Sequence, residues 1–191
     1  MTPTTTIETY TIDPGLSQFT VRAFATGMFS SLGHSPTLTV REFSGQASFS
    51  PEALGAVRLV IRIRASSFSV TDNLSDQDRK ELERTLNRDV LDTNRYPEIV
   101  FESIQASAIK AGDTFFVDLV GALTLHGVTN SQAVATQVSL NGDLLRAHGE
   151  FTVLQSVHGI KPVSVAGGAI KLKDELKCCF DIVARKKEDD R

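Results

Sequence analysis

The sequence predicts an all-β protein, and three observations favour an antiparallel barrel. Apolar and polar residues alternate in about ten segments, which is the period of a strand with one apolar face. Short links containing turn residues separate most of these segments, and only one segment has helical spacing. A closed barrel removes the edges that an open sheet of about ten strands would expose, and long tilted strands suit it.

The N-terminal strands are expected to follow one another through tight connections. The first two are predicted to pair through the turn residues Asp13-Pro14-Gly15, and a bend or bulge is predicted at Ser44-Gly45. One or two of the ten segments are expected to be parts of a single bent strand. In chain order the segments are residues 8–12, 17–24, 37–43, 45–50, 57–63, 99–106, 115–125, 133–140, 144–154 and 176–184.

The segment 57–63 has the clearest alternation. Its apolar residues, which begin with Val57 and Leu59, share one face, and Arg58 and Arg62 share the other with Arg64. A row of arginines is also compatible with nucleic-acid binding. The net charge of −3, from 20 basic and 23 acidic residues, argues against that function, so a solvated outer face is the better interpretation.

A β-hairpin is predicted around His126-Gly127. Val117, Leu119 and the residues at the same parity up to Leu125 are apolar, and the apolar pattern returns over residues 133–138. Glycine adopts the positive φ that a tight reversal often needs, so the chain is expected to turn at His126-Gly127.

One amphipathic helix is predicted over about residues 75–91. Leu82, Leu86 and Val90 have helical spacing, Ser75 is a plausible N-cap, and acidic residues follow it in the first turn. Tyr96-Pro97 then returns the backbone to an extended conformation. A single helix of this kind can cap one end of a barrel.

Three motifs in this order resemble the YceI family, over residues 10 to 184. They are residues 10–14 with Ser17-Gln18-Phe19, the stretch 96–103 that begins Tyr96-Pro97, and the hairpin 121–129. Leu16 departs from the family pattern, in which many members have a histidine, although His34 lies nearby in the sequence. The resemblance implies a bacterial, lipocalin-like barrel of about eight antiparallel strands. It also implies that the barrel binds a long isoprenoid or similar amphiphile without chemistry, often in the periplasm.

Length and composition bound the remaining classes. The 191 residues fit one domain, expected over residues 8–185, with a flexible segment 1–7 before it and a charged tail 186–191 after it. No run approaches the roughly 18 apolar residues of a membrane-spanning helix, and the N-terminus lacks signal-peptide features, so a cytoplasmic protein is expected. Cys178 and Cys179 are adjacent, hence expected to face opposite ways as reduced thiols, one of them inward.

No pattern in the sequence indicates an enzyme, a metal site or a cofactor. His34, His126, His148 and His158 lack the paired spacing of metal ligands; His126 and His158 are expected in turns or at a rim, and His148 facing out. No nucleophile elbow is present, and Gly167-Gly168 lacks the lysine of a phosphate-binding loop. A hydrolase or isomerase that uses His34, His126 or His158 remains a third hypothesis.

The leading hypothesis is a barrel that sequesters a polyisoprenoid, isoprenoid quinone or fatty-acid-like chain. An alternative is a stress-related scaffold with a filled barrel, an exposed apolar patch or a homodimer, and no small-molecule ligand. Each buried methylene of a ligand would contribute about 0.8 kcal/mol, so a long chain needs no hydrogen bond to bind. The residues expected to line the binding site are Phe19, Val21, Leu59, Ile61, Phe101, Leu119, Leu123, Phe151 and Phe180.

Overall fold

The structure is a computed structural model that describes residues 7–26, 35–165 and 170–187. Strands dominate it. They are β1 (Glu8–Ile12), β2 (Gln18–Thr26), β3 (Thr37–Val40), β4 (Phe43–Phe49), β5 (Arg58–Arg64), β6 (Phe68–Val70), β7 (Glu98–Ala111), β8 (Thr114–Leu125), β9 (Val128–Asn141), β10 (Leu144–Leu154), β11 (Ser164–Val165) and β12 (Ile170–Lys186). The helical elements are α1 (Asp76–Thr85), the π-helical turn η3 (Leu86–Val90), and the short 3-10 turns η1 (Leu54–Ala56), η2 (Ala65–Ser67) and η4 (Ser156–His158).

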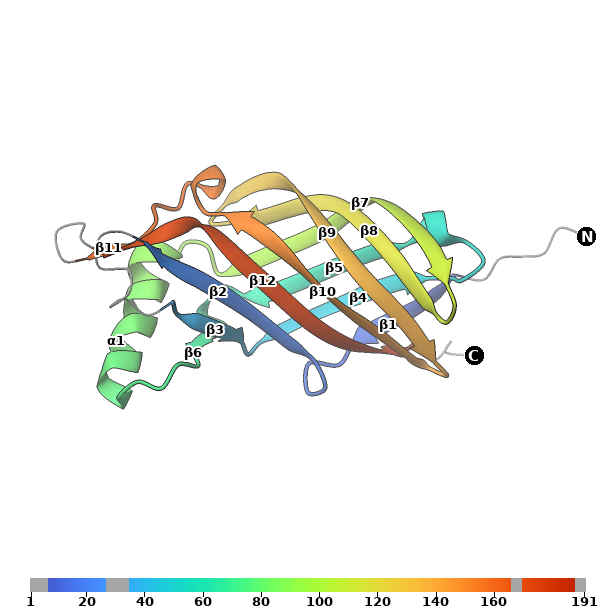
Figure 1. The fold of residues 1–191 in the computed structure, drawn as a ribbon, viewed down its shortest axis with the longest axis horizontal. Coiled ribbons are helices and arrows are strands. Elements are labelled where there is room, and N and C mark those ends of the chain that lie inside the picture. The colour runs from blue at the N-terminus through green and yellow to red at the C-terminus, as the bar shows by residue number, and fades with distance from the viewer. Residues whose placement is uncertain (1–6, 27–34, 166–169, 188–191) are drawn as a thin grey trace, which may run out of the picture.

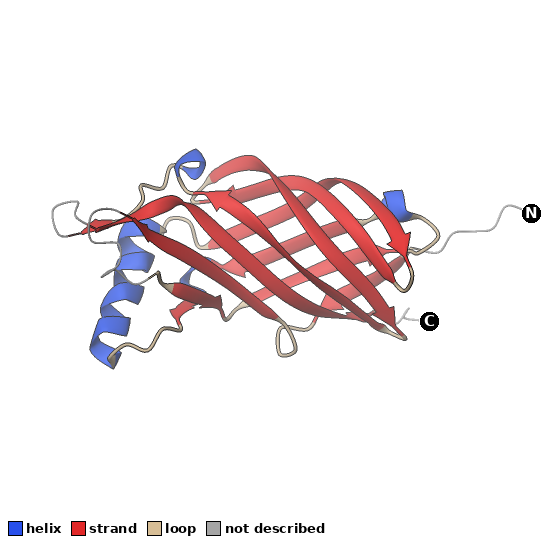
Figure 2. Ribbon diagram, viewed as in Figure 1, coloured by secondary structure: helices blue, strands red, loops and turns tan. Residues whose placement is uncertain are grey.

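Eight strands of the described chain close into an antiparallel barrel, as the sequence predicts (Figure 1). The pairing runs from β1 through β4, β5, β7, β8, β9, β10 and β12, and β12 pairs again with β1. The turns at Gly112 and Gly142, with η1, form one end of the barrel, which we call the base (Figure 1). Helix α1 lies across the opposite end, which we call the helix end (Figure 2).

The predicted pairing of the first two segments is wrong. β1 and β2 instead follow one another in the same direction along β12, so that together they occupy one strand position, or stave, of the barrel. Both pair with β12, through Ile12 opposite Ala184 and Phe19 opposite Phe180. The chain does not reverse between them: the Asp13 amide donates to the Val183 carbonyl at 2.9 Å, and the Val183 amide donates to Ser17 Oγ at 2.9 Å. Asp13-Pro14-Gly15 is therefore a loop that leaves β12 and returns to it.

The same design recurs in two neighbouring staves. β3 and β4 follow one another, as do β5 and β6; β3 pairs with β2 and β6, whereas β4 pairs with β1 and β5. The predicted bend at Ser44-Gly45 is wrong, since both residues lie inside β4 in continuous register with β5. A side chain on Gly45 would place its Cβ 2.5 Å from the Val60 carbonyl oxygen and 2.8 Å from Ile12 Cδ1. Close approach of neighbouring chains, rather than a bend, explains this glycine.

The predicted hairpin at His126-Gly127 is confirmed. His126 and Gly127 have φ of 52° and 74°, so the two-residue turn joins β8 directly to β9 at Val128. The apolar residues of β8 that begin with Val117 and Leu119 are buried, as their shared parity predicts. Strand β9 begins five residues before the predicted start at residue 133, because the residues after the turn are mostly polar and face solvent.

The predicted helix is also present, with a different C-terminal part. The Ser75 side chain accepts from the Asp78 amide at 3.1 Å, which confirms the N-cap, and the helix continues as the π-helical turn η3 to Val90. No residue of α1 or η3 is buried. None of the described helices is long and apolar enough to cross a membrane.

Candidate ligand-binding cavity

A cavity of about 280 Å³ runs inside the barrel, and its lining is almost wholly apolar. The strands put one side chain in two toward it, which explains why residues at alternate positions gather there. All nine residues that the sequence singled out lie on its lining. They come from β2, β5, β7, β8, β10 and β12, so the barrel brings together residues that are far apart in the sequence.

Three phenylalanines form a cluster on one side of the cavity. Phe19, Phe151 and Phe180 come from β2, β10 and β12, and their ring centroids lie 6.3 to 6.4 Å apart. Gly149 makes room for this cluster, because a Cβ there would lie 2.9 Å from Phe180 Cζ and 2.4 Å from the Ala135 carbonyl oxygen. All three rings lie on the cavity lining.

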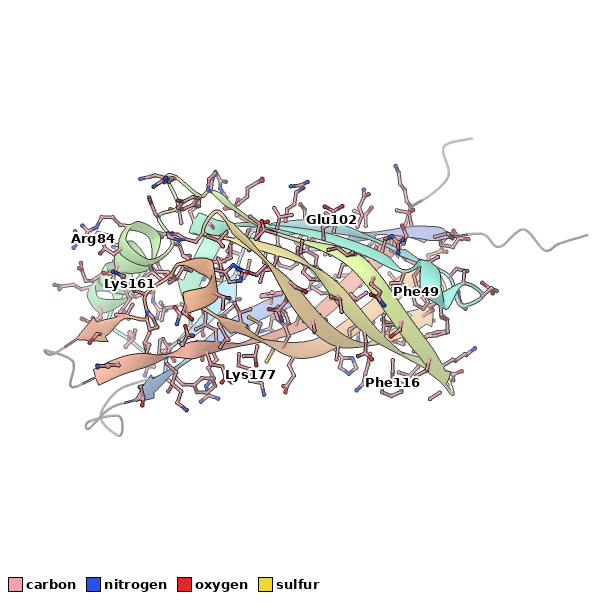
Figure 3. The ribbon with its side chains drawn as sticks, turned by 90° about the horizontal axis from the view of Figure 1, so that it is seen from above. Phe49, Arg84, Glu102, Phe116, Lys161 and Lys177 are labelled. Carbon is pink, nitrogen blue, oxygen red and sulfur yellow. The ribbon has the colours of Figure 1, made fainter. Side chains whose placement is uncertain are left out.

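The base of the barrel is closed by buried aromatic rings. Phe49 and Phe115 meet edge to face with centroids 5.0 Å apart, and they are only 2% and 4% exposed. Phe49 lines the cavity and Phe115 does not, so Phe49 is the floor and Phe115 lies behind it. Tyr10 is 4% exposed, and its burial raises the pKa of the phenol above its usual range. Figure 3 shows Phe49 toward the base, far from Arg84 of α1.

The helix end is closed less tightly. Leu82, Leu86 and Val90, from α1 and η3, line the cavity, yet Leu82 remains 44% exposed. A side chain that borders both the cavity and solvent marks the place where the cavity approaches the surface. Arg58 also borders the cavity, but its neighbours Val57 and Leu59 face inward, so the alternation of β5 places its side chain on the outer face.

Two polar side chains on the lining are already bonded to the protein. Thr136 Oγ1 donates to the His148 carbonyl at 3.1 Å, and Gln155 Nε2 donates to the Lys173 carbonyl at 2.9 Å. The Cys178 thiol also lines the cavity; burial raises its pKa to about 12, so it stays protonated at neutral pH. Cys179 is half-buried, and both thiols are free, as expected from their opposite directions on β12.

The described histidines lie outside the cavity lining. His126 sits in its turn against the Tyr96 ring with centroids 4.5 Å apart, and His148 is exposed, as predicted. His158 lies in a turn, as predicted, and it is buried there: it is 1% exposed and its Nδ1 lies 2.9 Å from the Val128 carbonyl oxygen. The described residues contain no cluster of three potential metal ligands. His34 and Gly167-Gly168 lie outside the described residues.

Sequence reasoning missed the contribution of the helix to the lining. Leu82, Leu86 and Val90 carried the signal, because their helical spacing defines an apolar face that must meet something apolar. Leu172 was missed for another reason: it has the same parity as Leu176, but the predicted strand began only at residue 176, whereas β12 begins at Ile170.

The model of the YceI-like domain matches residues 10–184, which is nearly the whole chain. The chain belongs to the YceI family. Its closed barrel of antiparallel strands agrees with the fold that the three sequence motifs imply.

Solved structures of low sequence identity share the YceI fold. Burkholderia cenocepacia BcnA has a TM-score of 0.70 at 19% identity, over 90% of this chain and 98% of that one. A Saccharophagus degradans protein described as a polyisoprenoid binding domain has a TM-score of 0.67 at 12% identity, over 93% and 98%. The Campylobacter jejuni YCEI protein has a TM-score of 0.60 at 16% identity, over 79% and 85%. No curated protein sequence matches the chain.

Proposed function

We propose that this YceI-family protein binds an elongated apolar or amphiphilic molecule inside its barrel and carries out no chemistry on it. The observation that supports this proposal most strongly is an apolar cavity of about 280 Å³ in a domain whose base is closed by packed aromatic rings. An empty cavity lowers the stability of a protein, because the side chains that line it lose packing contacts. A cavity that is kept despite this cost is typical of a binding site.

The size of the cavity indicates the class of ligand. An engineered cavity of about 150 Å³ accepts benzene, so 280 Å³ suits roughly twice that bulk. A chain with ten buried methylenes would gain about 8 kcal/mol from leaving water, before the entropy lost on binding. We therefore favour an alkyl or isoprenoid chain of about this length inside the barrel, with any longer or polar part at the helix end.

The chemistry of the lining supports a binding function over catalysis. Among the described residues that line the cavity there is no carboxylate or imidazole, and the Cys178 thiol is held in its protonated form. The third hypothesis needs histidines at the cavity, and the described ones lie elsewhere. The description of the Saccharophagus relative as a polyisoprenoid binding domain is consistent with an isoprenoid ligand here. The bacterial source and the cytoplasmic location stay predictions.

Mass spectrometry of organic extracts tests this proposal. Protein purified without detergent is extracted, and the extract is compared with that of the variant Ala147→Phe, which places a ring into the cavity. We expect a lipid-like species at about one molecule per protein in the original extract, and its loss in the variant. Equal amounts in both extracts, or none in either together with no uptake of the apolar dye N-phenyl-1-naphthylamine, would contradict the proposal.

One observation favours the scaffold alternative as a second candidate. Ile109 of β7 and Phe116 of β8 lie opposite one another on the outer face, 68% and 42% exposed, and Ile104 and Val120 lie further along the same strands, 68% and 40% exposed. This alternative also predicted a filled barrel, which the cavity argues against. Analytical ultracentrifugation with the same dye separates the two: a dimer without dye uptake favours the scaffold.

A further inference from the structure

The helix end of the barrel is held by polar contacts and by the partly buried Leu86 and Val90, with no fully buried side chain in α1 or η3. Glu83 Oε1 of α1 accepts from the Val70 amide at 3.0 Å and from Ser69 Oγ at 2.8 Å. Arg79 of the same helix donates to the carbonyls of Val70 and of Asp72, the latter at 3.0 Å. Because β6 is the last strand of the sheet path, these side chains bond to backbone groups at a sheet edge.

Such contacts exchange with water at little net free energy. When such a bond breaks at the surface, water bonds to both groups, whereas exposing a fully buried apolar side chain has no such compensation. No residue of α1 or η3 is buried, although their apolar residues border the cavity. The free energy that separates a closed from an open helix is therefore small compared with that of unfolding the barrel.

Fixed points lie on either side of the helix. Before it, Asp72 Oδ2 accepts from the Thr37 amide at 2.9 Å, which ties this residue to β3. After it, Leu91 is buried, and Asp92 has a positive φ of 44°. Beyond that, Tyr96 packs on the His126-Gly127 turn. The segment between Asp72 and Leu91 can thus swing without disturbing the strands.

We propose that α1 with η3 is a lid over the entrance of the cavity, and that the contacts of Glu83 and Arg79 with β6 are the latch that keeps it closed. Opening breaks the latch, turns Leu82 and Leu86 away from the cavity, and exposes the interior at the helix end only. The base stays closed by Phe49 and Phe115. The lid would be the entrance for the proposed ligand, so its role rests on the proposed function. The opening motion itself needs no ligand.

Cys178 provides a test that is independent of any ligand. Its thiol lies on the cavity lining and is 5% exposed, so a small thiol reagent reaches it only when the barrel opens. The protein carries Cys179→Ser, is freed of bound lipid, and is labelled with methyl methanethiosulfonate at constant pH. Glu83→Ala removes half of the latch. Glu81→Ala is the matched control, because Glu81 lies on the same helix and forms an ion pair with Arg84 of that helix, with an N–O distance of 2.7 Å.

We expect Glu83→Ala to speed labelling of Cys178 about tenfold and Glu81→Ala to leave the rate within twofold of the starting protein. Ser69→Ala, which removes one bond from the other side of the latch, should give a smaller increase. The lid is overturned if Glu83→Ala and Glu81→Ala label alike, or if the increase for Glu83→Ala equals its increase in the global unfolding constant measured with urea. A lid that behaves as expected in a protein that takes up no apolar dye would reject the proposed ligand and keep the lid.

Discussion

The two ends of the barrel are closed in different ways. At the base, Phe49 and Phe115 are buried and packed against each other, and Tyr10 is buried as well, so opening this end would expose large apolar surfaces. At the helix end, Leu82 is half-exposed, and Glu83 is bonded to the edge of β6. Packing contributes several kcal/mol per large side chain, whereas hydrogen bonds can be replaced by bonds to water. One end therefore stabilises the barrel, and the other can open while the barrel remains folded.

The largest expected effect is at the base. Phe49→Ala removes a ring that is 2% exposed and leaves Phe115 without its partner, so the free energy of unfolding should fall by about 3 to 5 kcal/mol. Urea denaturation followed by circular dichroism measures it. A loss below about 1 kcal/mol would mean that the base is not closed by packing, and the contrast between the ends would fail.

The wall of the barrel between the two ends should, like the base, be closed to water, and the pH dependence of stability tests this at Cys178 of β12. Burial raises the pKa of the Cys178 thiol from 9.0 to about 12, so the folded state holds this proton more tightly than the unfolded state. The contribution is fully present below pH 9 and is lost as pH rises toward 12, by about 1.4 kcal/mol per pH unit.

The difference between the starting protein and Cys178→Ala isolates this effect from other groups that titrate in the same range. The starting protein should lose more unfolding free energy than Cys178→Ala between pH 9 and pH 10.5, and Cys179→Ala should behave like the starting protein. Parallel curves for all three proteins would show that Cys178 is accessible to water.

The contact of Tyr96 with the His126-Gly127 turn, which follows the lid in the chain, should contribute less to stability than the base does. Gly127→Ala forces a side chain into a backbone with φ of 74° and places its Cβ 2.3 Å from Tyr96 Cε1, so we expect a loss of about 2 to 3 kcal/mol. Gly142→Ala is the control, since φ there is 58° and nothing lies within 4 Å of the new Cβ. Equal losses for the two variants in urea denaturation would mean that the Tyr96 contact contributes nothing.

The smallest effect on stability is expected at the lid itself. Leu82→Ala should lower the unfolding free energy by less than about 1 kcal/mol, because the side chain is 44% exposed. The same variant should shorten the lifetime of bound N-phenyl-1-naphthylamine in stopped-flow displacement, since the lid loses apolar contact with the cavity. A loss as large as that of Phe49→Ala would place the lid in the core and erase the contrast.

The alternation of residues was enough to predict the faces of the strands. The parity of Val117 and Leu119 identified the inner face of β8, and the same reasoning put Phe151 and Phe180 on the lining. The helix was predictable too, because Ser75 and the spacing of Leu82 are local signals. These features depend on neighbours in the chain, which a sequence displays directly.

Features that depend on distant parts of the chain were not predictable. Asp13-Pro14-Gly15 has the composition of a reversal, and only the bonds of Asp13 and Ser17 to Val183 show that the strand continues. Gly45 resembles a bend until Val60 and Ile12 are seen to approach it. The burial of His158 likewise follows from its contact with Val128 across the barrel end. Alternation gives the face of a residue and not its partner.

The central claim is that the interior of the barrel, entered from the helix end, is the binding site. Titration of N-phenyl-1-naphthylamine into Ala147→Phe and Ala135→Phe tests it most directly. Ala147 lines the cavity, whereas Ala135 on the neighbouring strand β9 is exposed on the outer face. We predict saturable binding of one dye to the starting protein and to Ala135→Phe, and affinity at least tenfold weaker for Ala147→Phe. Equal affinity in all three proteins would contradict the account.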